Sequence, residues 1–201
     1  MKKTLCILVS VFAICTICNA QLISSKQITR ERPHAIWMEI GGLLGSDKYT
    51  GDVSGTPSNA GFKISFRWTK RYSDYFAMDY INLGMGPRFH SGEITNSDGK
   101  HWTPDVDGTL SLCLGPRGFF PLNYKNSLFV NYNAGIAFIS FCGNGGTLAF
   151  HQEASFGIEF HKRLALSLFY ENTPKAKNMK YDGYTFSASQ GQLGLRFGFS
   201  F

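Results

Sequence analysis

The C-terminal segment, residues 185–201, constrains the fold because its side chains alternate in size and polarity. One face carries Leu193, Leu195, Phe197, Phe199 and Phe201. The other face carries Gln192, Gly194, Arg196, Gly198 and Ser200. Successive side chains of a β-strand point to opposite faces, so this alternation predicts a strand. A terminal aromatic residue favours a strand that ends at a membrane interface, with its ring in the interface and its carboxylate in water.

Similar alternation recurs upstream and predicts further strands. With the C-terminal segment, the predicted strands are residues 35–44, 60–69, 75–85, 108–120, 128–138, 147–160, 164–171 and 185–201. Most have about 9 to 12 residues, the length that a tilted strand needs to cross a bilayer. In the third of them the apolar residues change face, and a β-bulge near Asp79 and Tyr80 would reconcile the two frames.

The connections alternate between short turns and longer polar segments. Turns at residues 70–74, 121–126 and 161–163 are expected in the periplasm, and residues 46–58, 86–106, 140–146 and 172–184 outside the cell. An open sheet edge cannot be hydrated in lipid, so the sheet has to close. The sequence therefore predicts an all-β fold, an eight-stranded antiparallel transmembrane up-and-down β-barrel.

Lipid-facing aromatic residues are expected to form a girdle at each membrane interface. The periplasmic girdle is expected to contain Trp68, Phe120, Phe160, Phe199 and Phe201. The extracellular girdle is expected to contain Phe62, Phe138, Phe150, Tyr170 and Phe186.

The N-terminal residues have the pattern of a secretory leader. Lys2 and Lys3 precede an apolar run at residues 5–17, and the small residue Ala20 follows it. The run is too short to span a bilayer as a helix. We expect a signal peptide at 1–20, cleaved on export, a periplasmic lead-in at 21–34, and the barrel at 35–201.

Two further segments carry a family resemblance. The sequence from Gly115 to Leu122 (GPRGFFPL), followed by Leu128 to Gly135 (LFVNYNAG), resembles the central hairpin of small outer-membrane barrels of the OmpA/OmpX kind. The aromatic end of the last strand is similar to the assembly signal of bacterial outer-membrane barrels. The resemblance implies a place in the Gram-negative cell envelope and insertion by the barrel-assembly machinery. The residues that would guide insertion are Leu193, Leu195, Phe197, Phe199 and Phe201.

Charged residues on the inward face are the first candidates for a functional role. They are Glu39, Lys63, Arg67, Arg117, His151, Glu153, Glu159, Glu171 and Arg196. Their mixed signs predict a charge-paired lumen. An eight-stranded barrel has an interior just wide enough for side chains to fill, which favours a structural plug over a small-solute channel.

His151, Glu153 and Ser155 offer the residue types of acyl transfer, as base, orienting group and nucleophile. Their spacing places them in one row facing the lumen, with the glutamate between the other two. A lipid substrate would lie outside the barrel. We therefore expect no catalytic residues and no enzyme, and keep a lipid A deacylase or acyltransferase as the alternative.

The long connection at residues 86–106 is the expected contact surface, in keeping with a structural or binding role. Its candidates are Arg88, Phe89, His90, Lys100, His101 and Trp102. His90, His101, Glu93 and Asp98 lack the spacing of a metal motif, so no metal and no cofactor are expected.

Expected partners are outer-membrane lipids or lipopolysaccharide and an extracellular or envelope protein. The net charge is +6, but the basic residues are scattered, which argues against nucleic acid. We expect a monomer.

Overall fold

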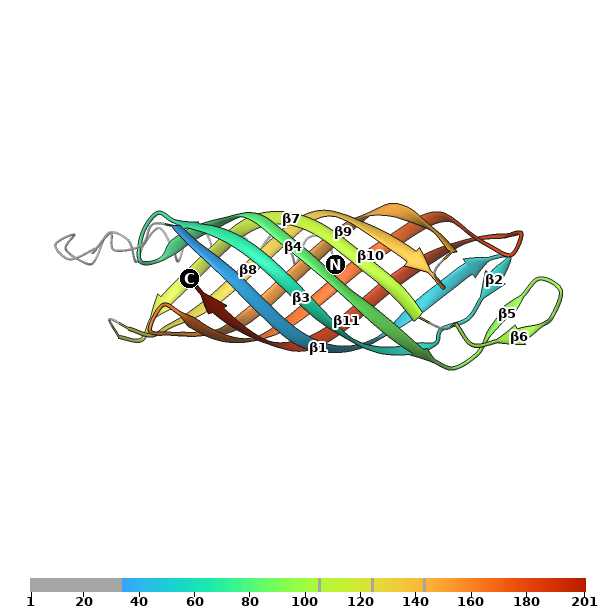
Figure 1. Cartoon of the computed structure of the whole chain (residues 1–201), viewed down its shortest axis with the longest axis horizontal. Helices are drawn as coiled ribbons and strands as arrows, with labels where there is room; N and C mark the ends of the chain where they lie inside the picture. Colours follow the sequence, from blue (N-terminus) through green and yellow to red (C-terminus); the bar gives the residue numbers. More distant parts are fainter. Residues whose placement is uncertain (1–33, 105, 124, 143) are drawn as a thin grey trace, which may run out of the picture.

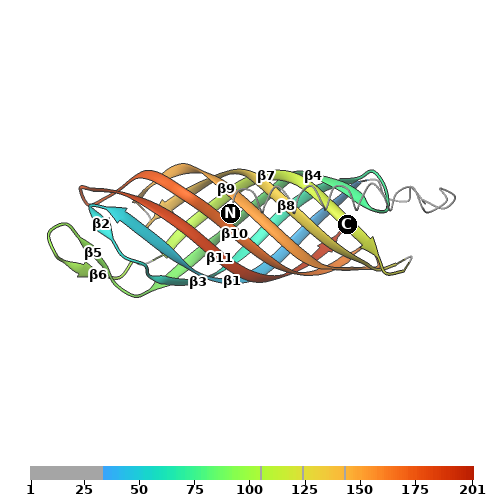
Figure 2. The same cartoon turned by 180° about the vertical axis from the view of Figure 1, so that it is seen from behind.

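The protein is a closed β-barrel (Figures 1 and 2). The computed structural model describes residues 34–104, 106–123, 125–142 and 144–201. The barrel strands are β1 (His34–Gly51), β3 (Ser58–Arg71), β4 (Phe76–Ser91), β7 (Val106–Pro121), β8 (Ser127–Phe141), β9 (Asn144–Phe160), β10 (Leu164–Tyr181) and β11 (Tyr184–Ser200). All neighbours are antiparallel, and β11 pairs with β1 to close the sheet. The predicted eight-stranded barrel is confirmed. The expected signal peptide and nearly all of the expected lead-in fall on residues 1–33, outside the described residues.

Several strands run further than the sequence predicted at the end opposite the short turns. β1 continues to Gly51, β4 to Ser91 and β10 to Tyr181, so much of the predicted connections 46–58, 86–106 and 172–184 belongs to the barrel wall. At the end of β1, polar residues lie on both faces, which erases the apolar alternation that marks a membrane strand. In β10, register shifts on either side of Ala176 interrupt the period of two.

The predicted bulge is present in β4. Trp68 of β3 pairs with Ile81, whereas the next residue, Thr69, pairs with Asp79. Tyr80 and Ile81 are therefore both exposed on the outer face, while Asp79 on one side and Asn82 on the other point inward. The bulge lets both apolar frames of this segment face lipid.

The outer wall carries a continuous set of exposed apolar side chains. Leu44 is 68% exposed, Leu193 58% and Ile36 55%. A soluble monomer rarely exposes such an area, and a lipid-facing barrel requires it. In the described part of the chain, no helix has both the length and the apolar character needed to cross a membrane.

One expected girdle residue was wrong: Phe186 is only 2% exposed, because the alternation counted back from Phe201 places it inside.

A small second sheet lies at the end with the longer connections (Figure 1). It contains β2 (Val53–Ser54), β5 (Ile94–Asn96) and β6 (His101–Trp102). Val53 and Ile94 are completely buried, and the amide of Asp52 donates to the carbonyl oxygen of Thr185 in β11 at 3.1 Å. These contacts hold the sheet against the mouth of the barrel. We call this end the outer mouth, because short turns mark the periplasmic end of such barrels.

Candidate functional site

The centre of the lumen is organised around Glu153 of β9, which is 1% exposed. Its carboxylate accepts hydrogen bonds from Lys63 Nζ at 2.9 Å and Arg196 Nη2 at 2.8 Å. Arg67 Nη2 and Asn82 Nδ2 lie 3.5 and 3.4 Å from Glu153 Oε1. Donors from three other strands therefore converge on one carboxylate across the interior.

Two more glutamates complete this central network. Glu171 accepts from Lys63 Nζ at 2.5 Å. Glu39 accepts from Arg67 Nη2 at 2.8 Å and from Arg196 Nη1 at 3.0 Å. The three carboxylates and the three cations balance in charge, which is the condition under which buried ions are tolerated.

The half of the lumen nearer the short turns is filled by cations stacked on aromatic rings. The Arg71 guanidinium lies 3.8 Å from the centre of the Phe119 ring, and that of Arg117 lies 4.6 Å from the Phe129 ring. Asp79 accepts from Thr69 at 2.6 Å and lies 3.4 Å from Arg67 Nε. Asp79 also lies 3.6 Å from Arg117 Nε. Glu159 pairs with Arg71 at 3.3 Å.

The structure places all nine inward-facing candidates in the interior. Their exposed fractions are 5% or less. His151 Nδ1 lies 3.0 Å from the Thr173 hydroxyl, and the Ser155 hydroxyl donates to the Asn131 side-chain oxygen. The row His151, Glu153 and Ser155 therefore has separate partners, and its histidine does not contact its serine.

A second polar group lies nearer the outer mouth, and we call it the mouth cluster. It consists of Asp47 and Tyr49 of β1, Asn59 of β3, His90 of β4 and Asp107 of β7. His90 Nε2 lies 2.9 Å from Asp47 Oδ2 and 3.6 Å from Asp107 Oδ2. The Tyr49 hydroxyl lies 3.3 Å from Asp47 Oδ2 and 3.4 Å from Asp107 Oδ2.

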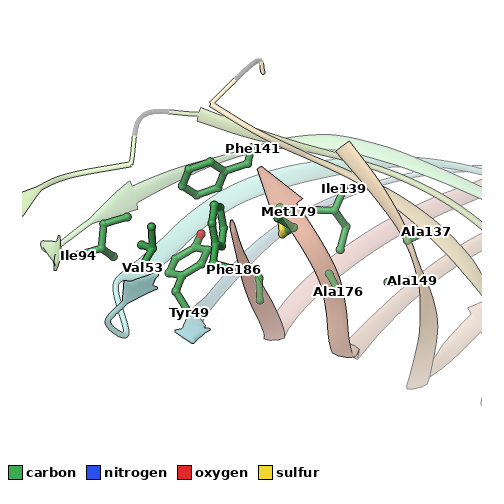
Figure 3. Packing of buried hydrophobic residues seen from close by; sticks show 11 residues of the cluster. Tyr49, Val53, Ile94, Ala137, Ile139, Phe141, Ala149, Ala176, Met179 and Phe186 are labelled. Carbon is green, nitrogen blue, oxygen red and sulfur yellow. The ribbon is translucent and has the colours of Figure 1, made fainter. Parts of the chain in front are cut away.

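An aromatic plug covers the mouth cluster on its outer side. Figure 3 shows Tyr49, Phe141 and Phe186 grouped at the ends of their strands, with Val53 and Ile94 of the second sheet beside them. The Phe141 ring centre is 4.9 Å from that of Phe186 and 5.4 Å from that of Tyr49. The ion-paired centre and this plug together fill the lumen at separate levels.

The expected loop candidates divide into two groups. Arg88 and His90 were expected in an outer loop, but β4 carries them inward, where Arg88 is 2% exposed and the His90 side chain 0%. Phe89 points outward and is 51% exposed. The correction follows from the length of β4: once the strand continues to Ser91, alternation places residues 88 and 90 inside and 89 outside.

Lys100 and His101 are exposed on the β5–β6 hairpin. His101 Nδ1 lies 3.8 Å from Glu93 Oε2, with both side chains largely exposed. Trp102 instead packs on the plug, since its ring centre is 5.7 Å from that of Phe141. Of the four residues considered for a loop metal site, His90 lies inside the barrel, and His101 lies near Glu93 on the exposed hairpin.

A row of lysines crosses the outer wall below the mouth. Lys48 of β1 pairs with Ser189 of β11, and Lys175 and Lys177 flank Ala176, which pairs with Ala188 of β11. All three lysines are exposed. With strands spaced at about 4.8 Å, Lys48 and Lys175 lie roughly 10 Å apart across β11. We call these three residues the lysine row.

Sequence reasoning missed Asp47 and Tyr49, which fall in the predicted connection 46–58. It also missed Asp107, which lies between the predicted connection 86–106 and the predicted strand 108–120. The signal available for Asp47 and Tyr49 was the same period of two: they continue the inward frame of Leu43. Asp79 was located at the bulge but not recognised as part of the interior network.

Comparisons with known proteins concern the fold only. No protein-family model matches the sequence. No curated protein matches it. Similar solved structures include OprG from Pseudomonas aeruginosa, with 8% identity and a TM-score of 0.47 over 84% of this chain and 96% of that one. Neisserial surface protein A shows 10% identity and a TM-score of 0.46, over 80% of this chain and 95% of that one. The outer membrane enzyme PagL shows 12% identity and a TM-score of 0.46, over 79% of this chain and 97% of that one. These values carry no conclusion about activity, and the fold assignment rests on the closed barrel itself.

Proposed function

We propose that the protein is a closed outer-membrane barrel with no enzymatic activity, and that it acts by binding at the outer face of the membrane. The observation that carries the proposal is the filled lumen. The ion pairs of Glu153, the stacked Arg71 and Arg117, and the plug around Phe141 occupy it at three levels. Solutes have no open route through such an interior, so the exposed outer surfaces remain as the functional ones.

The first test is conductance. The purified barrel reconstituted into a planar bilayer should give no channel currents, because the lumen is packed with charge-balanced side chains. A porin inserted under the same conditions serves as the positive control. Reproducible single-channel steps from the folded barrel would refute the closed-lumen proposal and favour the small-solute channel.

The lysine row supplies the surface that we expect to bind lipopolysaccharide. Lys48, Lys175 and Lys177 lie just beyond the apolar belt, at the height where the phosphates of an outer leaflet lie. A lysine near an anionic membrane surface contributes about 1 kcal/mol. Spaced about 10 Å apart, the ammonium groups can contact neighbouring phosphates of one lipid A headgroup.

Replacing Lys48, Lys175 and Lys177 together by glutamine should weaken lipopolysaccharide binding by about 3 kcal/mol, or roughly 100-fold in Kd. The measurement is a titration of fluorescent lipopolysaccharide into the purified barrel at low and high salt. The wild-type affinity should fall with salt, because exposed charges are screened. A variant with Lys125 and Lys162 replaced by glutamine, at the periplasmic turns, is the matched control.

If the triple variant and the double control variant bound lipopolysaccharide with equal affinity, the lysine row would be refuted as the binding surface. The lipopolysaccharide recovered from the titration should also keep its acyl chains, as read by mass spectrometry of lipid A. A lost or added acyl chain would replace the binding proposal with the lipid-modifying alternative.

A further inference from the structure

The mouth cluster contains three side chains that can bind metals, brought together from three strands. Asp47 comes from β1, His90 from β4 and Asp107 from β7, and one ligand atom of each lies within 4.8 Å of the others. All three side chains are fully buried. The cluster is separate from the central network, whose anions are Glu39, Glu153 and Glu171.

The ligand atoms have the separations of a small coordination sphere. His90 Nε2 is 2.9 Å from Asp47 Oδ2 and 3.6 Å from Asp107 Oδ2. The Tyr49 oxygen lies 3.3, 3.4 and 3.5 Å from Asp47 Oδ2, Asp107 Oδ2 and His90 Nε2. Four ligands around a zinc ion at about 2.0–2.1 Å are about 3.3 Å apart. The four atoms therefore need only small shifts to enclose one ion.

Neighbouring groups hold the carboxylates in this orientation. Asn59 Nδ2 donates to Asp47 Oδ1 at 2.7 Å, and the backbone amide of Cys142 donates to Asp107 Oδ1 at 3.0 Å. These bonds hold one oxygen of each carboxylate and direct the other toward His90. Gln190 Nε2 also donates to Asp47 Oδ2, at 3.4 Å. Anchoring of this kind is typical of residues that hold metal ligands in place.

The two buried carboxylates of the cluster need positive charge nearby. Among the described residues, ion pairs join Asp47 and Asp107 only to His90. Arg88 pairs with Asp107 in the strand register, but its buried Nε and Nη2 have no hydrogen-bond partner in the described structure. Two buried carboxylates are costly without compensation. Arg88, buried beside Asp107, supplies one positive charge. One carboxylate charge then remains, for a protonated His90 or a bound divalent ion to balance.

We propose that Asp47, His90 and Asp107, with the Tyr49 hydroxyl as a fourth ligand, bind one divalent transition-metal ion of the zinc class. An imidazole nitrogen favours such ions over magnesium or calcium, which prefer all-oxygen sites. The site is enclosed beneath the aromatic plug shown in Figure 3, as closed structural metal sites are. A bound ion would tie β1, β4 and β7 together at the outer mouth.

The test is to refold the full chain into detergent with Zn²⁺, with Co²⁺, or with a chelator, and to remove loosely bound ions by dialysis. We expect about one zinc per folded chain by elemental analysis, a higher unfolding midpoint with zinc, and visible absorption bands of four-coordinate Co²⁺. Folding is verified independently by the mobility of the unheated barrel in SDS gels.

His90→Gln and Asp107→Asn should each abolish zinc retention and the zinc-dependent rise in midpoint. Asn59→Ala should weaken zinc binding by roughly 10–100-fold, because it frees Asp47 from its anchor. His151→Gln is the matched control, since this buried histidine bonds to Thr173 outside the cluster. A folded wild-type barrel that retains no zinc, or His90→Gln retaining as much as wild type, would overturn the proposal.

If the variants fail to fold, the wild-type Co²⁺ spectrum and zinc stoichiometry still decide the question. A midpoint that depends on pH through His90 but not on zinc would identify a protonated histidine as the counter-ion and refute the metal site. Neither result depends on whether the lysine row binds lipopolysaccharide.

Discussion

Replacing Glu153 with alanine should lower the free energy of unfolding by about 3–5 kcal/mol, the usual loss when one partner of a buried ion pair is removed. The physical reason is that Lys63 and Arg196 lose the carboxylate that both contact within 3 Å, and neither can reach water. Arg67 loses a weaker contact at 3.5 Å. The measurement is equilibrium unfolding of the barrel by urea or guanidinium in lipid vesicles.

Glu93→Ala is the matched control for this change, because its side chain is 70% exposed and its removal should alter stability by less than about 0.5 kcal/mol. Similar unfolding midpoints for the two variants would contradict the central role of Glu153.

Replacing Phe141 with alanine should cost about 3–5 kcal/mol, the range found for truncating a buried phenylalanine. Its ring, 1% exposed, contacts the rings of Tyr49, Trp102, Tyr181 and Phe186. Because Trp102 attaches the β5–β6 hairpin to the plug, the variant should also be cut faster by proteases at residues 93–104. Unfolding in vesicles and a proteolysis time course measure the two effects.

Phe138→Ala in the same strand is the control, since its ring faces lipid and is 42% exposed. It should cost less than Phe141→Ala and leave the hairpin resistant. A hairpin that is cut equally fast in both variants would show that the plug does not hold the second sheet.

The sequence predicted the membrane-embedded part of the barrel well, for a physical reason. There, one face meets lipid and the other meets packed side chains, so the alternation is clear in β3, β9 and β11. It placed Arg67, Glu153 and Arg196 inside. It could not show which of them meet, because contacts across the lumen depend on strand tilt and stagger. Lys63 and Glu153, for example, are 90 residues apart in sequence.

The sequence failed at the outer mouth, where lipid no longer imposes a pattern. Lys48 and Thr50 face water while Asp47 faces the interior, so polar residues occupy both sides of the strand and resemble a loop. His90 was also assigned to a loop, although Phe89 beside it is exposed on the outer face. The mouth cluster depends on the extra strand length that this ambiguity concealed.

The seam between the first and the last strand has a consequence for how the molecule assembles. Arg196 on β11 forms an ion pair with Glu39 on β1, and 157 residues separate the two in sequence. Before the seam forms, Glu39 lacks Arg196, and Glu153 lacks Lys63 and Arg67 of β3 across the lumen. Contacts between such distant parts of a chain form slowly, and they form last. Incompletely closed barrels should therefore carry unbalanced charge in their interior, which makes them unstable in a bilayer. Closure of the barrel should then be a single cooperative step.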